Sequence, residues 1–149
     1  MRENTKDRRK PTIVVSQSDY DRLDRLASAA GQRMPEASDA LFAELERARI
    51  VPDANLPDDV VKMGSSLEFK PDNGASKVVT LVFPEEADIA EGKISILTPI
   101  GTAVLGLRPR RSITWKARDG RQHELIVLSV QQRRAMPLLS PRSMVEVGA

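Results

Sequence analysis

The stretch ILTPIGTAVLGLRPRRSITW, Ile96 to Trp115, joins two strand-like runs through an apolar segment that is longer than a turn requires. Thr98 is placed to cap a short helix that begins with Pro99, a residue tolerated at the first helical position. An open antiparallel sheet must bury one of its faces, so we expect this helix to cover the sheet. Its apolar side would be formed by Ile100, Ala103, Val104 and Leu107.

Residues on either side of this segment alternate with a period of two, which is typical of strands. Such runs occupy residues 60–69, with a break at Gly64, and residues 76–83, 92–97 and 112–130. Asp119-Gly120 divides the last run, and an Asp-Gly pair between alternating residues indicates a β-hairpin. We therefore predict about five strands, mostly antiparallel.

Upstream, the apolar period changes to that of helices. Ser16 and Asp19 form an approximate capping box for a helix that we expect to end in a left-handed cap at Gly31. A second helix begins near Pro35, after the tight connection GQRMP. Isolated helices of about 15 residues are marginal in water, so we predict an antiparallel helical hairpin. Residues 51–59, VPDANLPDD, are typical of a linker.

The composition of the 149 residues excludes several classes of site. The chain has no cysteine and a single histidine, His123, so it offers neither a disulfide nor a thiolate or histidine-cluster metal site. No run is long and apolar enough for a bilayer span or a signal peptide, and we expect a cytoplasmic protein.

The net charge is only +2, but its distribution is uneven. Residues 52–91 carry nine acids and three bases, whereas residues 107–143 carry nine bases and two acids. Such segregation occurs on surfaces that meet charged macromolecules, and equally on solvated faces of neighbouring strands. An aromatic content of 3% disfavours base stacking with single-stranded nucleic acid.

The segment EEADIAEGKISILTPIGTAVLG, residues 85–106, resembles the signature of the C-terminal domain of bacterial Gre transcript-cleavage factors. Residues 9–26, 38–51 and 56–69 resemble the Gre-related Rnk proteins, which are named as regulators of nucleoside diphosphate kinase. The resemblance implies an α+β fold with a short coiled-coil hairpin at residues 11–51. It further implies an FKBP-like bent antiparallel sheet with one short helix at residues 56–132, followed by a tail at residues 133–149.

One local departure concerns the turn after this signature. The family usually continues with a Gly-Asp turn, and this chain has Pro109-Arg110-Arg111. An acidic turn has thus become basic, and contacts made by the missing Asp are not transferred to this chain.

The resemblance also implies a function, which is binding to RNA polymerase near its secondary channel. The implied docking residues are Asp88, Thr98, Pro99 and Ile100, whose purely structural roles would be capping for the first three and core packing for Ile100. We expect no catalytic residue, metal, cofactor or small-molecule substrate. Nucleic acid would be met only indirectly, through the transcription complex.

In Gre factors a hairpin tip carries acidic residues to the polymerase magnesium, since hard cations prefer oxygen ligands. Here the tip is formed by Gln32, Arg33 and Met34, with Glu36 and Asp39 just beyond it. That acidic pair could share one helix face, or could simply favour the helix N-terminus and face solvent. Each arm spans only about 22 Å at 1.5 Å per residue. We therefore predict that the protein does not cleave transcripts and competes with factors that do.

Two other functions stay open at this stage. The family name suggests a direct modulator of nucleoside diphosphate kinase, although such regulation could act through transcription. An FKBP-like prolyl isomerase is the other, but the predicted sheet domain contains only Phe69, Phe83 and Trp115 as aromatic rings for a proline-binding pocket.

Overall fold

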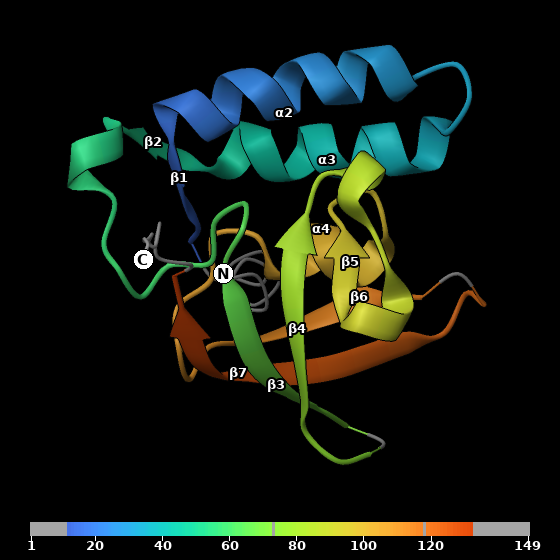
Figure 1. The fold of residues 1–149 in the computed structure, drawn as a ribbon. Helices are drawn as coiled ribbons and strands as arrows, with labels where there is room; N and C mark the ends of the chain where they lie inside the picture. The colour runs from blue at the N-terminus through green and yellow to red at the C-terminus, as the bar shows by residue number, and fades with distance from the viewer. Residues whose placement is uncertain (1–11, 73, 118, 133–149) are drawn as a thin grey trace, which may run out of the picture.

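A computed structural model of the protein describes residues 12–72, 74–117 and 119–132. A helical hairpin framed by two short strands is followed by a five-stranded sheet with an inserted helix (Figure 1). The predicted tail, residues 133–149, and Pro11 at the start of the predicted hairpin unit lie outside the described residues. Within the described ranges, no helix combines the length and apolarity that crossing a bilayer requires.

The helical hairpin is confirmed. Helix α2 spans Gln17–Ala30 and helix α3 spans Pro35–Arg47. The Ser16 hydroxyl accepts a hydrogen bond from the Asp19 backbone N–H at 3.2 Å, as predicted for the cap of α2. The left-handed cap predicted at Gly31 is wrong, because this residue has φ −58° and continues the right-handed turn by donating its N–H to the Ser28 carbonyl.

Two three-residue strands stand at the base of the hairpin. Strand β1 (Val14–Ser16) pairs in parallel with strand β2 (Arg49–Val51), which places the two ends of the hairpin side by side. The predicted linker is therefore partly ordered, since its first residue, Val51, ends β2 and residues Asp53–Asn55 form the 3-10 turn η1.

The η1 turn is tied back to the first turn of α2. The Asp53 carboxylate accepts a hydrogen bond from the Ser18 backbone N–H at 3.0 Å. Hydrogen bonding to Ser18, through its side chain and then its backbone, lowers the pKa of Asp53. A carboxylate at this position also favours the helix N-terminus electrostatically.

The second half of the chain forms a curled mixed sheet with strand order β5-β4-β3-β7-β6. Among the described residues three of its four strand pairings are antiparallel, as predicted, whereas β5 runs parallel to β4. The connection between these two strands contains the 3-10 turns η2 (Pro84–Glu86) and η3 (Ile89–Glu91) and crosses back before β5 begins. The strand bounds are β3 Ser66–Pro71, β4 Lys77–Val82, β5 Lys93–Ser95, β6 Ser112–Lys116 and β7 Gln122–Gln131.

Two turns determine where these strands begin. The predicted hairpin at Asp119-Gly120 is confirmed, because β6 and β7 flank it and Gly120 has φ +85°. The strand predicted over residues 60–69 begins only at Ser66, since Gly64 turns the chain with φ +90°. A register shift between Glu68 and Phe69 in the pairing of β3 with β7 accompanies the curl of the sheet.

The hairpin and the sheet share one hydrophobic core. Helix α4 (Pro99–Val104) contacts both α3 and β6 and lies between the helical hairpin and the sheet, as Figure 1 shows. Leu23 and Leu41 of the hairpin and Leu67 of the sheet are buried in the same cluster. The prediction that the short helix covers one face of the sheet is confirmed. The helical hairpin packs against this helix and forms a further layer.

Polar contacts also hold the hairpin to the sheet unit. The Asp19 carboxylate accepts a hydrogen bond from the Met63 backbone N–H at 3.1 Å, so its side chain does not complete the predicted capping box. Burial raises the pKa of Asp19, against the lowering effect of this hydrogen bond. The Arg22 guanidinium lies 4.1 Å from the centroid of the Phe83 ring, a cation–π distance.

Candidate functional site

The predicted docking residues Thr98, Pro99 and Ile100 lie where β5 leads into α4. The Ser95 carbonyl accepts hydrogen bonds from the Thr98 N–H at 3.0 Å and from the Thr98 hydroxyl at 2.7 Å. That hydroxyl accepts in turn from the Gly101 N–H at 3.1 Å. Thr98 is therefore the helix cap that the sequence predicts, and its hydroxyl is engaged within the chain.

The residues that follow Thr98 fit the same tight connection. Pro99 occupies the first turn of α4, where a backbone N–H would have no partner within the helix, so its missing N–H costs no hydrogen bond. A Cβ atom at Gly101 would lie 2.2 Å from the Ser95 carbonyl oxygen, so a side chain has no room there. The Thr102 hydroxyl donates to the Ile96 carbonyl at 2.7 Å. The Thr-Pro-Ile-Gly-Thr pattern thus has a local structural reason.

Ile100 is half-buried and packs against the hydrophobic core. Its aliphatic side chain therefore has a structural role as well as an exposed part. Because Thr98 and Pro99 are also only half-buried, this connection presents a shaped, largely apolar surface beside the end of β5.

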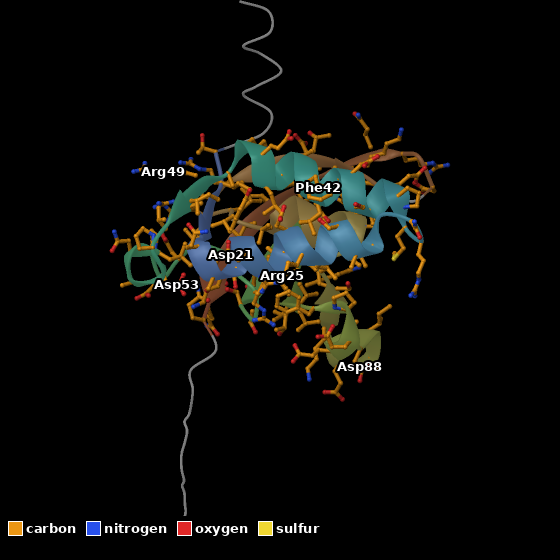
Figure 2. All side chains as sticks on the ribbon, turned by 90° about the horizontal axis from the view of Figure 1, so that it is seen from above. Asp21, Arg25, Phe42, Arg49, Asp53 and Asp88 are labelled. Atoms are coloured by element: carbon orange, nitrogen blue, oxygen red, sulfur yellow. The ribbon has the colours of Figure 1, made fainter. Side chains whose placement is uncertain are left out.

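The fourth predicted residue, Asp88, lies at the other end of β5. Its backbone N–H and carbonyl bond to Lys93 at 2.9 Å each, which fixes the loop at the start of this edge strand. The side chain is exposed, and its carboxylate makes no hydrogen bond or ion pair with another described residue. In Figure 2 Asp88 lies well away from Arg49 and Asp53, near the opposite end of the molecule.

Ile89, directly after Asp88, is a candidate that the sequence analysis missed. Its side chain is 88% exposed, the largest value among the exposed large apolar residues of the described chain. Glu85, Glu86 and Glu91 surround it in sequence and are also exposed. The sequence did carry a signal for an exposed position here, because this isoleucine lies between acidic residues and outside any alternating run. Residues 84–91 therefore present one large apolar side chain among exposed acidic residues. Single exposed apolar residues are common on protein surfaces.

The structure brings the four predicted docking residues to one sheet edge without joining them into one cluster. Asp88 precedes β5 and Thr98 follows it, so the length of the strand separates them. A partner that touches both would have to lie along the outer side of β5.

The hairpin tip is exposed from Gln32 to Glu36. The Met34 N–H donates to the Ala30 carbonyl at 2.8 Å, and the Ser38 hydroxyl donates to the Ala27 carbonyl at 2.7 Å, which together close the connection. Glu36 and Asp39 both face solvent on α3. Across the described ranges no three His, Cys, Asp or Glu side chains are grouped so as to hold a metal ion.

The aromatic rings of the sheet unit lie in or against the core. Phe69 and Phe83 are buried in the core, and Trp115 is a half-buried residue packed against it. Among the described residues, none of these three rings lines the hollow beside Arg108 and Ser112 or the hollow beside Lys70 and Glu124.

The fold and this edge define a small α+β protein, with a helical hairpin packed on a curled sheet unit. The family described as "Transcription elongation factor, GreA/GreB, C-term" matches residues 56–132, and the Rnk N-terminus family matches residues 11–51. The chain belongs to the GreA/GreB family and, within it, is a homologue of the Rnk proteins.

Individual relatives agree with this assignment. The regulator of nucleoside diphosphate kinase of Escherichia coli (strain K12) is 35% identical over 123 residues, 82% of this chain and 90% of that protein. The transcription elongation factor GreA of Nitratidesulfovibrio vulgaris is 37% identical over 82 residues, which cover 54% of this chain and 51% of that factor.

A solved structure shares the fold. The GreA/GreB transcription elongation factor from Nitrosomonas europaea has a TM-score of 0.65 and 36% identity, covering 82% of this chain and 99% of that one. The expected α+β fold, with a Gre-like, FKBP-type C-terminal unit, is therefore confirmed.

Proposed function

We propose that this protein regulates transcription in the cytoplasm by docking on RNA polymerase near its secondary channel, without stimulating transcript cleavage. The observation that carries the proposal is the combination of a Gre-type C-terminal unit with a short hairpin whose connecting residues 31–34 lack a carboxylate, Glu36 being the nearest acid. Docking would use the edge beside β5, and the hairpin would occupy the entrance. Nucleic acid would be met only through the transcription complex, and the regulator itself would need no cofactor.

The docking surface that we propose contains Asp88, Thr98, Pro99 and Ile100, with Ile89 as an addition. Asp88 and Ile89 supply the parts most available to a partner, a carboxylate without an internal bond and an almost fully exposed aliphatic side chain. Thr98, Pro99 and Ile100 supply shape, because the cap and core contacts hold them rigidly. A few well-buried side chains usually dominate binding, which makes Ile89 the first residue to test.

The hairpin geometry argues against cleavage. Helices α2 and α3 contain 14 and 13 residues, or about 20 Å each at 1.5 Å per residue. Arg33 at the exposed tip would oppose an approaching magnesium ion. Glu36 and Asp39 are two solvent-facing carboxylates, a weak set for a cation that demands near-octahedral oxygen coordination.

Competition with cleavage factors follows if both occupy one docking surface on the polymerase. The test uses the full chain, since the hairpin and sheet share a core. Binding to core polymerase is measured for the protein and for the variant Ile89→Ser. The variant Val78→Ser is the matched control, because Val78 is another largely exposed aliphatic residue, with 66% of its surface accessible. We expect Ile89→Ser to weaken binding about tenfold or more and Val78→Ser to leave it unchanged. Equal affinities for both variants would reject the proposed docking edge.

A backtracked polymerase complex tests the absence of cleavage. The protein alone should leave the transcript length unchanged, and an excess should slow cleavage by a genuine Gre factor. If this protein alone stimulated cleavage, and Glu36→Ala or Asp39→Ala abolished it, the proposed absence of cleavage activity would be wrong. Those acids would then be identified as metal ligands.

A second candidate function is direct modulation of nucleoside diphosphate kinase, which the name of the Escherichia coli relative favours. Purified kinase and purified protein separate the two functions. A change in kinase activity on addition of the protein, in the absence of polymerase, would support direct modulation. If the kinase activity were unchanged and the protein bound polymerase, any effect on the kinase would act through transcription.

A further inference from the structure

The basic turn after α4 lines a hollow at the base of the hairpin. This hollow has a volume of about 600 Å³. Among the described residues that line it, four of seven are arginines and none is acidic: they are Thr12, Val14, Arg49, Arg108, Arg110, Arg111 and Ser112. We call it the arginine pocket. It contains the two arginines that replace the family's Gly-Asp turn.

The fold brings these arginines together from two distant segments. Arg49 lies on β2, and its backbone N–H donates to the Ile13 carbonyl at 2.9 Å. The Val14 N–H on the neighbouring strand β1 donates to the Gly106 carbonyl at 3.3 Å, just before the basic turn. These bonds hold the base of the hairpin against the turn, so the wall of the pocket has a fixed backbone.

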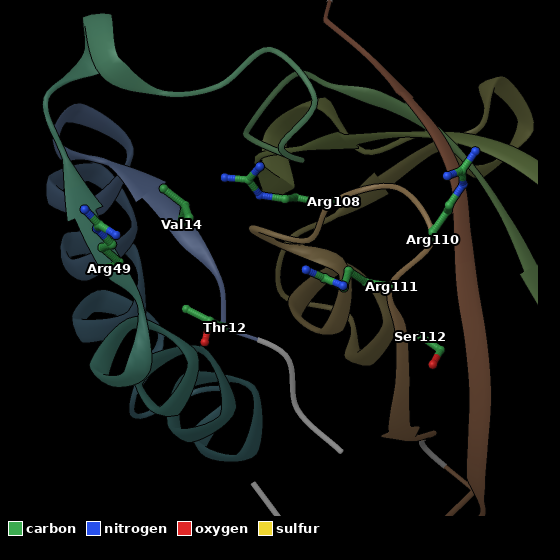
Figure 3. Close-up of a pocket in the computed structure, with 7 residues that line it drawn as sticks. All are labelled: Thr12, Val14, Arg49, Arg108, Arg110, Arg111 and Ser112. Atoms are coloured by element: carbon green, nitrogen blue, oxygen red, sulfur yellow. The ribbon is translucent and has the colours of Figure 1, made fainter. Parts of the chain in front are cut away.

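The basic turn has its own well-defined conformation. The Arg110 N–H donates to the Val127 carbonyl at 2.6 Å, and the Arg111 carbonyl accepts from the Val127 N–H at 2.9 Å. Arg110 has φ +72°, an uncommon left-handed conformation for a residue with a side chain. Figure 3 shows Arg108 and Arg111 extending from the turn toward β1, Arg49 on β2 next to that strand, and Arg110 pointing away beside β7.

Little negative charge within the chain balances this group. Arg108 lies 3.9 Å from Asp59, and both side chains are about half exposed, so the pair is weak. Arg49, Arg110 and Arg111 make no ion pair with any residue of the described ranges. Like charges that gather on one hollow repel one another, and an anion bound between them would relieve that repulsion.

We propose that the arginine pocket binds the oligophosphate group of a small phosphorylated ligand, such as a nucleoside di- or triphosphate. Guanidinium groups match phosphate oxygens with paired, charge-assisted hydrogen bonds. Thr12 and Ser112 are polar residues of the same lining. The volume also falls within the range of about 300–1,000 Å³ that is usual for small-molecule sites.

The lining indicates that the phosphates, and not a base, are recognised. The described residues of the lining include no aromatic ring on which a base could stack, and Val14 is the only apolar side chain among them. A nucleic-acid strand would need basic side chains along an extended groove with stacking rings, whereas these arginines line a single hollow. We therefore expect affinity to depend on the number of phosphates and hardly on the base.

The arginine pocket and the proposed docking edge are at different ends of the protein. Figure 2 shows Arg49 at the end opposite Asp88, and Figure 1 places β2 and β5 on opposite sides. Ligand binding can therefore be measured without polymerase, and its outcome is independent of the proposed function.

Calorimetry on the full chain tests the proposal, with inorganic tripolyphosphate, ATP and GTP as probes at low salt. We expect the three to bind with affinities within about threefold of one another, and orthophosphate to bind more weakly. Binding should weaken steeply as salt is raised, because charges at an open site are screened. Arg49→Gln and Arg111→Gln should each reduce affinity about tenfold.

Arg25→Gln, on the exposed face of α2, is the matched control, since it removes the same charge from a residue outside the pocket lining. It should leave affinity within about twofold of the parent, because it removes no direct phosphate contact. Thermal unfolding of every variant, each with an intact transition, establishes that the comparison is between folded proteins.

Several results would overturn the proposal. The first is a failure of tripolyphosphate to bind at low salt. The second is binding of ATP and GTP without binding of tripolyphosphate. The third is a loss of affinity in Arg25→Gln equal to the losses in Arg49→Gln and Arg111→Gln. A single-stranded RNA or an oligo-glutamate peptide that displaces tripolyphosphate at much lower concentration would assign the pocket to a macromolecule instead.

Discussion

Gly106 lies where the chain before the hairpin packs closely against the sheet unit, and its replacement by alanine tests how rigidly the two are joined. Gly106 has φ +78°, donates its N–H to the Val61 carbonyl at 2.8 Å and accepts from the Val14 N–H. A Cβ atom there would lie 2.5 Å from the Ile13 Cβ, and 3.1 and 3.2 Å from the Val14 backbone nitrogen and oxygen. Because these are backbone atoms or the stem of a buried side chain, the contact cannot be relieved by a rotamer change.

The expected loss of stability has two parts. The left-handed conformation costs an alanine about 1–2 kcal/mol. Overpacking against Ile13 adds about 1–3 kcal/mol. The Gly106→Ala variant should therefore lose about 2–5 kcal/mol of its free energy of unfolding. That is a large part of the roughly 5–15 kcal/mol that stabilises a domain.

Urea denaturation followed by circular dichroism measures this loss, with Gly120→Ala as the control. Gly120 has φ +85°, but a Cβ there meets nothing within 4 Å, so only the conformational part of the cost applies. The difference between the two variants isolates the close approach of the hairpin. If Gly106→Ala lost no more stability than Gly120→Ala, β1 would be free to move aside and the rigid junction inferred here would be wrong.

Two further predictions concern the start of α4 and the start of α2. Thr98→Ala should destabilise the protein by about 1 kcal/mol in the same assay because the Gly101 N–H loses its cap, whereas Thr98→Ser should retain most of that stability; equal losses would argue against capping. For Asp53, the lowered folded-state pKa means that its contribution is present above the unfolded pKa and is lost as the pH falls through the folded pKa. The stability difference between the protein and Asp53→Asn should therefore be largest near neutral pH and shrink in acid, and a pH-independent difference in urea titrations would refute this assignment.

Much of the fold was predictable because local interactions determine it. The helical period and Ser16 located α2, and its hydroxyl does cap the helix at the Asp19 N–H. Thr98 located α4 in the same way, and Gly120 located the hairpin of β6 and β7. Capping, amphipathic periods and tight turns each involve residues within a few positions, so the sequence displays them directly.

The predictions from the sequence were wrong where a residue forms its hydrogen bonds with a segment that is distant along the chain. The Asp19 side chain bonds to Met63 and leaves the capping box incomplete, since burial against the sheet brings that N–H close. Val60 and Val61 have the composition of a strand but are buried without forming one, because Val61 bonds to Leu107 outside the sheet. The direction of β5 depended on the crossover before it, which no alternating pattern specifies.

Local sequence patterns were sufficient to predict the two long helices, the short helix after β5, most of the sheet strands, the family resemblance and the docking candidates Asp88, Thr98, Pro99 and Ile100. Only the tertiary structure decided that Asp88 and Thr98 flank one edge strand, and that Ile89 beside them is exposed. It also decided that Arg49 and Arg111 line one hollow although they are far apart along the chain. The physical reason is that helix caps and strand periods are local, whereas strand partners and shared pockets depend on which packing of the whole chain buries the core.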